Sequence, residues 1–214
     1  QILWQPILNL LILNIRPRTT AANYAKVWMD EGSPITVYTK RQAAALQVRL
    51  GAAVQVDWAM RYGTRSIADR LAALMQSGCD RILLAPLYPQ YSAATNATVV
   101  DDAARALMDM RWQPTLRTMA PYFDNPDHIA ALAQSIRDGV AKLDFVPDLI
   151  LTSFHGMPLR TLEAGDPYHC QCMKTGRLLG EALGMKVKVT FQSRFGRAEW
   201  LKPYTDDTLL NLPK

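Results

Sequence analysis

Short apolar runs rich in β-branched residues alternate along the chain with longer segments of helical periodicity. This alternation is typical of βαβ units, in which a helix connects two parallel strands of one sheet. The pattern therefore predicts an α/β fold built on a parallel sheet. The candidate strands are Ile35–Tyr38, Ala53–Trp58, Arg81–Pro86, Thr115–Met119, Leu149–Ser153 and Val187–Gln192.

Capping residues and apolar spacing predict four helices between these strands. No repeat of fixed period is present, so a solenoid is not expected. The first helix is expected over 40–50, between a capping box of Thr39 and Gln42 and Gly51, and the second contains Ile67, Leu71, Leu74 and Met75 and ends before Gly78. The third is expected from Asp124 or Asn125, with Pro126 in its first turn, to about Leu143, and the fourth from Asp166-Pro167 to near Gly184.

Composition narrows the class of protein. With 214 residues, 49% of them hydrophobic and 20% charged, the chain has enough apolar surface for a substantial core. Its net charge of +5 comes from 24 Lys and Arg that are spread out rather than grouped, so nucleic-acid binding is not favoured. Phosphate-binding glycine motifs are missing, and neither Ser153 nor Ser193 lies in a nucleophile elbow, which argues against nucleotide binding and serine hydrolysis.

Three cysteines, Cys79, Cys170 and Cys172, are an odd number without disulfide-framework spacing, which predicts a reducing compartment and a cytoplasmic protein. The apolar residues 1–15 are interrupted by Pro6, Asn9 and Asn14 and are too short to span a bilayer. They lack signal-peptide features, and their packing in a core or against a membrane surface stays open. The chain starts without Met and stops at Lys214, so a fragment incomplete at both ends is expected.

Aromatic, cationic and imidazole side chains follow the ends of the predicted strands. Ligands of open parallel sheets bind at this edge, and such a rim suits a large flat anionic ligand. The alternative, that these aromatic residues are merely core edges with one polar tip in water, fits the pattern equally well. The segments concerned are Ala59–Gly63, Leu87–Ser92, Phe154–Pro158 and Ser193–Arg197 with Trp200.

His155 is the strongest candidate for chemistry because it directly follows an apolar strand and precedes Gly156. Neutral imidazole accepts a proton or binds a divalent metal. No metal site is predicted at His169, Cys170 and Cys172, because residues 170 and 172 lie about 200° apart around a helix and cannot share a metal.

Six motifs follow one another in order along the chain: Gly32-Ser-Pro34, Met60-Arg-Tyr-Gly63, Leu87-Tyr-Pro-Gln-Tyr-Ser92, Ser153-Phe-His-Gly-Met-Pro158, Gly165-Asp-Pro-Tyr168, and Phe191-Gln-Ser-Arg-Phe-Gly196 with Trp200-Leu-Lys-Pro-Tyr-Thr-Asp206. Through these motifs the chain resembles the ferrochelatase family, in its bacterial form, over essentially its whole length.

The resemblance implies two Rossmann-like halves, residues 1–120 being the later part of the first and 121–214 the opening of the second. It implies insertion of ferrous iron into protoporphyrin IX to form protohaem. His155 would be catalytic and would hold the metal. The porphyrin-binding residues implied are Arg61, Tyr62, Tyr88, Tyr91, Ser193, Arg194 and Trp200.

The resemblance also implies what accompanies the reaction. Ferrous iron would be a substrate, and no cofactor would be permanently bound. Some relatives carry an iron–sulfur cluster with a ligand just after the Tyr-Pro-Gln-Tyr-Ser segment, where this chain has Ala93, so no cluster is expected. Family members carry an N-terminal covering segment and a C-terminal acidic residue opposite the histidine, and this sequence holds neither. Three alternatives stay open: a chelatase for coproporphyrin or another tetrapyrrole, a non-catalytic porphyrin-binding fragment, and a generic α/β domain. The oligomeric state is not predicted.

Overall fold

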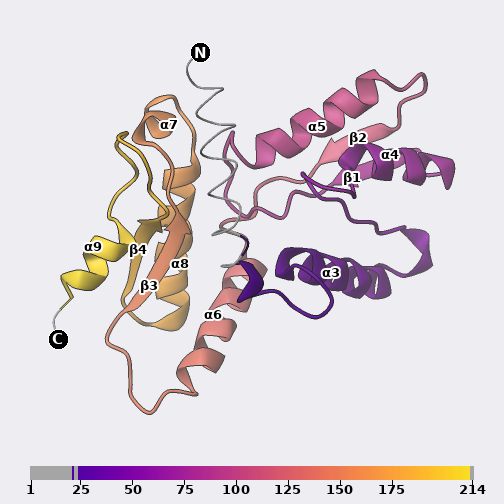
Figure 1. The fold of residues 1–214 in the computed structure, drawn as a ribbon. Helices are drawn as coiled ribbons and strands as arrows, with labels where there is room; N and C mark the ends of the chain where they lie inside the picture. The colour runs from indigo at the N-terminus through magenta and orange to yellow at the C-terminus, as the bar shows by residue number, and fades with distance from the viewer. Residues whose placement is uncertain (1–20, 22–23, 213–214) are drawn as a thin grey trace. The chain divides into compact units, whose positions relative to one another are not determined.

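The computed structural model describes residue 21 and residues 24–212. The apolar segment 1–15 lies outside the described residues, so what it packs against stays a prediction. The chain divides into two compact units, one reaching to Cys79 and one beginning at Asp80. Figure 1 labels the elements, which in chain order are α3 (Pro34–Leu50), η2 (Gly51–Ala53), α4 (Ile67–Gln76), β1 (Arg81–Leu84), α5 (Asn96–Met108), β2 (Thr115–Thr118), α6 (Pro126–Val140), β3 (Ile150–His155), α7 (Leu159–Glu163), α8 (Tyr168–Leu183), β4 (Val187–Gln192) and α9 (Thr205–Leu210).

The predicted strand Ile35–Tyr38 is wrong, because these residues form the first turns of α3. The side chain of Ser33 caps this helix by accepting a hydrogen bond from the Thr36 amide, and Pro34 occupies its first turn. A serine cap followed by proline starts a helix strongly enough to override a short β-branched run. The capping box predicted at Thr39 is therefore also wrong, since that residue lies inside the helix.

The predicted strand Ala53–Trp58 is wrong as well. Ala53 ends the short helix η2, and the segment after it pairs with no other strand among the described residues. The side chain of Gln47 takes over part of the backbone hydrogen bonding: its amide nitrogen donates to the carbonyl of Val54 at 2.9 Å, and its oxygen accepts from the amide of Val56 at 2.8 Å. A side chain of α3 thus holds this extended segment.

Four predicted strands are confirmed, all in the second unit, and they form two parallel pairs. In the first pair, β1 lies beside β2 with Arg81 opposite Thr115. In the second, β3 lies beside β4 with Ile150 opposite Val187 and His155 opposite Gln192. The predicted parallel α/β class is therefore confirmed within this unit. Strand β3 runs two residues beyond its expected end at Ser153, so His155 belongs to the strand itself.

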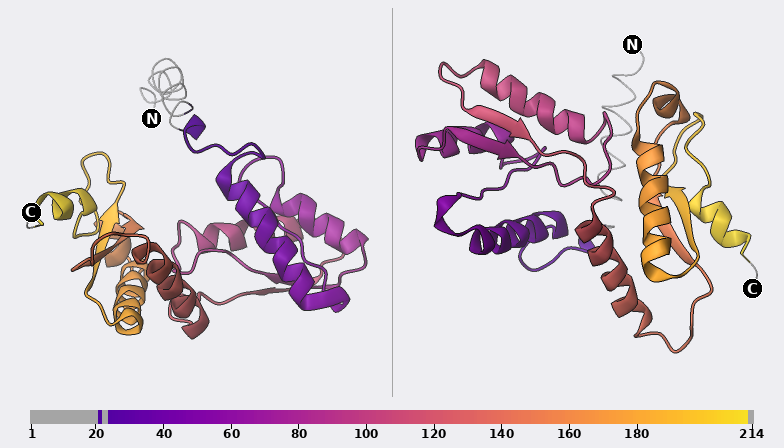
Figure 2. Two further views of the ribbon diagram at one scale, coloured as in Figure 1. Left: turned by 90° about the horizontal axis from the view of Figure 1, so that it is seen from below. Right: turned by 180° about the vertical axis from the view of Figure 1, so that it is seen from behind.

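Helix α8 packs closely on β4. A β-carbon built on Gly176 would stand 2.2 Å from Cγ2 of Val189, so only glycine permits this approach. Cys172 and Leu179 lie on the same buried face of the helix, at the spacing of an amphipathic helix. Figures 1 and 2 show α8 on one side of the β3–β4 pair and α9 on the other. The core here consists of Cys172, Val189, Phe191 and Leu201, with Phe154, Met157, Leu159, Leu162 and Tyr168 packed against it.

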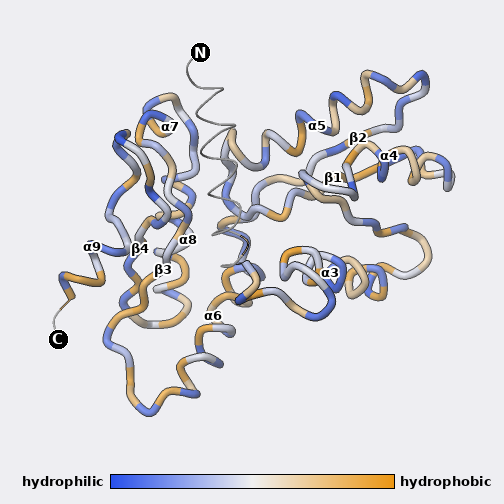
Figure 3. The backbone as a smooth tube through the Cα atoms, in the orientation of Figure 1, coloured by the Kyte–Doolittle hydropathy of each residue, from blue (hydrophilic) through white to orange (hydrophobic). Residues whose placement is uncertain are grey.

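Helix α6 packs along α8. Ile129 and Ala133 of α6 are buried, and Figure 3 shows hydrophobic and hydrophilic segments alternating along this helix. The predicted cap is confirmed, because the side chain of Asn125 accepts hydrogen bonds from the amides of Asp127 and His128. Helix α5 had no counterpart among the predicted helices.

The predicted division near residue 120 concerns the two halves of the family fold and stays a prediction. The division by contacts falls earlier in the chain, between Cys79 and Asp80. None of the helices in the described part of the chain is long and apolar enough to cross a membrane.

Candidate functional site

His155 is the last residue of β3 and its side chain is exposed at the carboxyl end of the strand. Gln192, the last residue of β4, lies directly opposite. The amide of Gly156 donates a hydrogen bond of 2.7 Å to the carbonyl oxygen of Gln192, so the two chains stay together beyond the strands. The expectation that His155 and the segment starting at Ser193 share one edge is confirmed.

The residues after His155 are fixed by the segment that leads out of β4. We call His155–Pro158 the histidine loop and Ser193–Glu199 the arginine loop. Leu201 donates its amide to the carbonyl of Met157 at 2.9 Å, and Pro158 forms an isolated bridge with Trp200. These contacts hold the base of the histidine loop rigidly beside the end of the arginine loop.

Trp200 is buried, with 6% of its surface exposed. Its indole nitrogen donates a hydrogen bond of 3.0 Å to the carbonyl of Phe195, whose ring lies 5.0 Å from the indole ring. Phe195 is 70% exposed, so it presents the solvent-facing aromatic surface of this loop. The resemblance implies a binding role for Trp200 and none for Phe195, although both belong to the same motif.

Ser193 and Arg194 open the arginine loop. Ser193 has a left-handed backbone with φ of 70°, which serine adopts rarely. The guanidinium of Arg194 stacks on Tyr204 at 4.0 Å and pairs with Asp206 at 2.9 Å and Asp207 at 3.2 Å. An incoming carboxylate would therefore compete with two carboxylates of α9 for this cation.

Tyr88 and Tyr91 lie in a second loop of the same unit, Leu87–Ser92, which we call the tyrosine loop. The carbonyl of Tyr88 accepts a hydrogen bond of 3.1 Å from the side chain of Asn96. The amide of Tyr91 donates a hydrogen bond of 2.6 Å to the side chain of Gln171, at the start of α8. Helices on both sides thus hold the loop that carries these two rings.

The segment Gly165–Tyr168 connects the tyrosine and histidine loops. Asp166 accepts hydrogen bonds from the hydroxyl of Ser92 and the amide of Ala93, while the hydroxyl of Tyr168 donates to the carbonyl of His155 at 3.0 Å. The sequence predicts a helix start at Asp166-Pro167 and includes this motif in the resemblance, but it assigns these residues no functional role. A hydrogen-bonding side chain between a glycine and a proline was the available signal.

Tyr168 and Cys172 lie next to each other beneath the histidine loop. Burial raises the pKa of the Cys172 thiol to about 12. Burial also raises the pKa of Tyr168 well above its usual value, and the neighbouring Cys172 adds to the effect. Both groups are therefore neutral at physiological pH. Cys172 is buried and Cys170 is exposed, which confirms that the two thiols lie on different faces of α8.

Arg61 and Tyr62 belong to the first unit. Asp57 accepts hydrogen bonds from Arg65 and from Arg70, and Arg65 also donates to the carbonyl of Trp58 at 2.8 Å. This network closes the base of the loop 58–65. The guanidinium of Arg61 lies 4.8 Å from the ring centre of Tyr62, which is 78% exposed.

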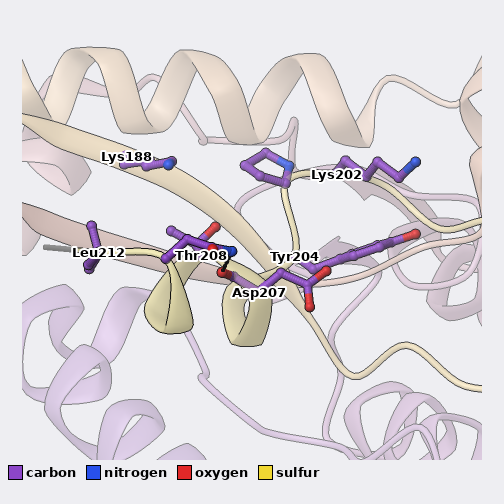
Figure 4. Close-up of a pocket in the computed structure, with 8 residues that line it drawn as sticks. Lys188, Lys202, Tyr204, Asp207, Thr208 and Leu212 are labelled. Atoms are coloured by element: carbon purple, nitrogen blue, oxygen red, sulfur yellow. Dashed lines mark hydrogen bonds between the residues drawn. The ribbon is translucent and has the colours of Figure 1, made fainter.

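Two further features of the described residues concern metal-ligating side chains and the shape of the surface. Within the described residues, no group of three or more His, Cys, Asp or Glu side chains could hold a metal ion. A shallow pocket of about 580 Å³ lies beside α9 (Figure 4), and no residue of the histidine loop lines it. Its lining residues are Lys188, Lys202, Pro203, Tyr204, Asp207, Thr208, Asn211 and Leu212.

The parallel strands carry an exposed histidine and hydrogen-bonded aromatic loops at their carboxyl ends. This arrangement is typical of α/β proteins that bind ligands at this edge of the sheet. The family model for ferrochelatase matches residues 1–214. The chain belongs to the ferrochelatase family.

Three relatives, each named ferrochelatase, illustrate the similarity. The protein of Azoarcus sp. (strain BH72) is 53% identical over 96% of this chain, that of Rhizobium meliloti (strain 1021) 53% over 100%, and that of Rhizobium etli (strain ATCC 51251) 54% over 98%. The matched residues make up 58%, 65% and 63% of these relatives, so the chain spans about six tenths of their length.

Proposed function

We propose that this protein inserts ferrous iron into protoporphyrin IX, with His155 as the group that takes up pyrrole protons or holds the metal. The observation that carries the proposal is the exposed imidazole of His155 at the carboxyl end of β3, in a chain that belongs throughout to the ferrochelatase family. Fe²⁺ replaces two pyrrole N–H protons, so the products are protohaem and two protons. Neutral imidazole is suited to receive a proton at this point.

The surroundings of His155 support this role. Its backbone carbonyl accepts a hydrogen bond from Tyr168, and the amide of Gly156 donates to the carbonyl of Gln192, so the imidazole projects from a fixed backbone. A proton acceptor that is positioned before the substrate arrives loses little conformational freedom in the reaction. The exposed ring of Phe195 and the clamped tyrosine loop supply aromatic surfaces on which a flat macrocycle can stack.

Insertion into a planar macrocycle is slow because the pyrrole protons shield its centre. An enzyme gains rate by holding the ring bent, with one pair of nitrogens turned toward the metal. Rigid loops suit that task better than mobile ones. We propose that Tyr88, Tyr91, Ser193 and Arg194 contribute to porphyrin binding, and that the buried Trp200 contributes by holding Phe195, whose ring is exposed. Arg61 and Tyr62 contribute as well, and the family motif Met60–Gly63 is the support for them.

The remaining expectations form part of the same proposal. Ferrous iron is a substrate that meets a site without a permanently bound cofactor, and Ala93 in place of a cysteine argues against an iron–sulfur cluster. The cysteine pattern supports a cytoplasmic location, and contact with a membrane surface is compatible with it.

The test is anaerobic insertion of Fe²⁺, with Zn²⁺ as a surrogate, into protoporphyrin IX, followed by the loss of free-porphyrin fluorescence. We expect turnover by the wild-type chain and its loss in His155→Ala. His128→Ala is the matched control, because this imidazole packs edge-on against Tyr122 at the start of α6. Its activity should be unchanged.

The alternatives give different outcomes. Faster insertion into coproporphyrin in direct competition would change the substrate and keep the reaction. Porphyrin binding without insertion would identify a non-catalytic binding fragment. A folded chain that binds no porphyrin would overturn the proposal.

A further inference from the structure

The carboxylate of Asp166 receives three hydrogen bonds on its two oxygens. One oxygen accepts from the hydroxyl of Ser92 at 2.9 Å and from the amide of Ala93 at 2.8 Å. The other accepts from the amide of Tyr168 at 3.0 Å. The first two donors belong to the last residue of the tyrosine loop and to the residue after it, and the third begins α8, so one side chain joins these two parts of the unit.

Both ends of this connection reach a proposed functional group. Ser92 is fully buried and directly follows Tyr91, whose own amide is held by Gln171. Tyr168 donates through its hydroxyl to the carbonyl of His155 at 3.0 Å. A continuous path of hydrogen bonds therefore runs from the tyrosine loop through Asp166 and Tyr168 to the backbone of His155.

Asp166 is also tied to the chain that follows the histidine loop. Its amide donates to the carbonyl of Thr161 at 3.0 Å, and Thr161 belongs to α7, which starts directly after Pro158. Displacement of Asp166 would thus move both loops relative to each other. Misplacement of a reacting group by about 1 Å lowers rates by up to roughly a hundredfold.

We propose that Asp166 is a positioning residue that fixes the aromatic side chains of the tyrosine loop relative to the imidazole of His155. The inference rests on the proposed function, since it assigns a porphyrin-binding role to one loop and the proton or metal chemistry to the other. Asp166 itself does not touch the substrate. Its effect passes through Ser92 and Tyr168.

The chemistry of the site explains why a carboxylate is needed. All three partners are donors, and a carboxylate accepts on both oxygens, whereas an amide accepts on one only. In Asp166→Asn, the NH₂ group must face a donor whichever way the amide is turned. The substitution keeps the size of the side chain and breaks at least one of the three contacts.

The first measurement follows the NMR signal of His155 in the histidine loop while the tyrosine loop is altered by substitution. The chain has only three histidines, so the ring-proton NMR signal of His155 can be assigned with His155→Ala. We expect Ser92→Ala, which alters the tyrosine loop, and Asp166→Asn to shift or broaden the signal of His155 and to leave that of His128 in place. This readout needs no turnover.

Asp124→Asn is the matched control. Asp124 also ties a connecting segment to α8, through an ion pair of 2.6 Å with Lys174, but it touches neither loop. It makes the same chemical change in the same unit. We expect it to leave the His155 signal where it is.

The second measurement is kinetic. Asp166→Asn should lower kcat for Fe²⁺ insertion by about tenfold and raise KM for protoporphyrin IX several-fold, while Asp124→Asn changes neither. The effect of Asp166→Asn on kcat and KM should be smaller when Tyr91→Phe is already present, because both substitutions then weaken the proposed contact between the Tyr91 side chain and the porphyrin. A merely structural residue would lower stability without this dependence on Tyr91.

The outcomes separate the two proposals. If the wild-type chain does not turn over and Asp166→Asn still moves the His155 signal, the insertion reaction fails and the connection between the loops stands. If wild type turns over, and Asp166→Asn leaves kcat, KM and the His155 signal unchanged, the positioning role is overturned. Equal effects of Asp166→Asn and Asp124→Asn would also overturn it.

Discussion

The backbone of Gly156 lies directly against the indole ring of Trp200. A β-carbon built on Gly156 would stand 3.2 Å from Cε3 of that ring and 2.6 Å from the carbonyl oxygen of Gln192. The nearer of these atoms belongs to the backbone of β4 and cannot rotate away. The close approach of the histidine loop to β4 therefore depends on a residue without a side chain.

Gly156→Ala should destabilise the protein by about 1–3 kcal/mol, because the added methyl group forces the loop away from β4. Urea denaturation measures the change. The control is Gly139→Ala in α6, where a β-carbon meets nothing within 4 Å and alanine should stabilise by up to about 1 kcal/mol. The same sign for both substitutions would contradict the contact between Gly156 and Gln192.

Cys172 should make the protein less stable as the pH rises above 9. Its folded-state pKa is raised by burial from 9.0 to about 12, so the unfolded chain ionises first. The contribution of the protonated Cys172 thiol to the free energy of unfolding is fully present below pH 9. It is lost as the pH rises toward 12, at up to about 1.4 kcal/mol per pH unit. Cys172→Ala should flatten this slope, whereas Cys170→Ala, at an exposed position, should leave it unchanged. Denaturation curves at several pH values decide.

Asp57 gives the opposite pH dependence. Burial raises the pKa of this carboxyl, but hydrogen bonds from the Trp58 amide, Arg70 and Arg65 outweigh burial, and the pKa is lowered below 3.8. Its contribution is present above pH 3.8 and is lost as the pH falls through the folded-state value.

Asp57→Asn should therefore destabilise the first unit by about 1–3 kcal/mol at pH 7, and the difference from wild type should shrink below pH 3. Glu31→Gln is the control in the same unit, because its ion pair with Arg41 is exposed and contributes little. A deficit of Asp57→Asn that stays constant from pH 7 to pH 2 would contradict the charge-based explanation.

Ser193 should gain stability when it is replaced by glycine. Among the described residues it is the only non-glycine with a positive φ, a conformation that costs an L-residue about 1–2 kcal/mol. Ser193→Gly removes this strain and loses about 0.5–1 kcal/mol to the greater freedom of the unfolded chain. The net gain should be up to about 1 kcal/mol in thermal denaturation. Ser193→Ala keeps the β-carbon and should show no gain.

Local sequence signals predicted the second unit well. Short runs with apolar and β-branched residues identified its four strands, and Asn125-Pro126 and Asp166-Pro167 marked the starts of α6 and α8. Two predicted strands and one predicted helix cap failed in the first unit for local reasons. Ser33-Pro34 begins a helix through residues that look like a strand, and the segment after Ala53 has no strand partner within the described residues.

The sequence by itself determined the family, the parallel α/β class and the place of His155 at the carboxyl end of an apolar strand, because each of these depends on residues that are neighbours in the chain. Only the tertiary structure decided that Trp200 is buried while Phe195 is exposed, that Arg194 is paired with α9, and that Asp166 connects two loops. Asp166 and Ser92 are 74 residues apart, and their contact exists only because α8 packs beside the tyrosine loop. Periodicity and spacing hold no information on which side chains such packing brings together, because that choice is made by shape and hydrogen bonding across the folded unit.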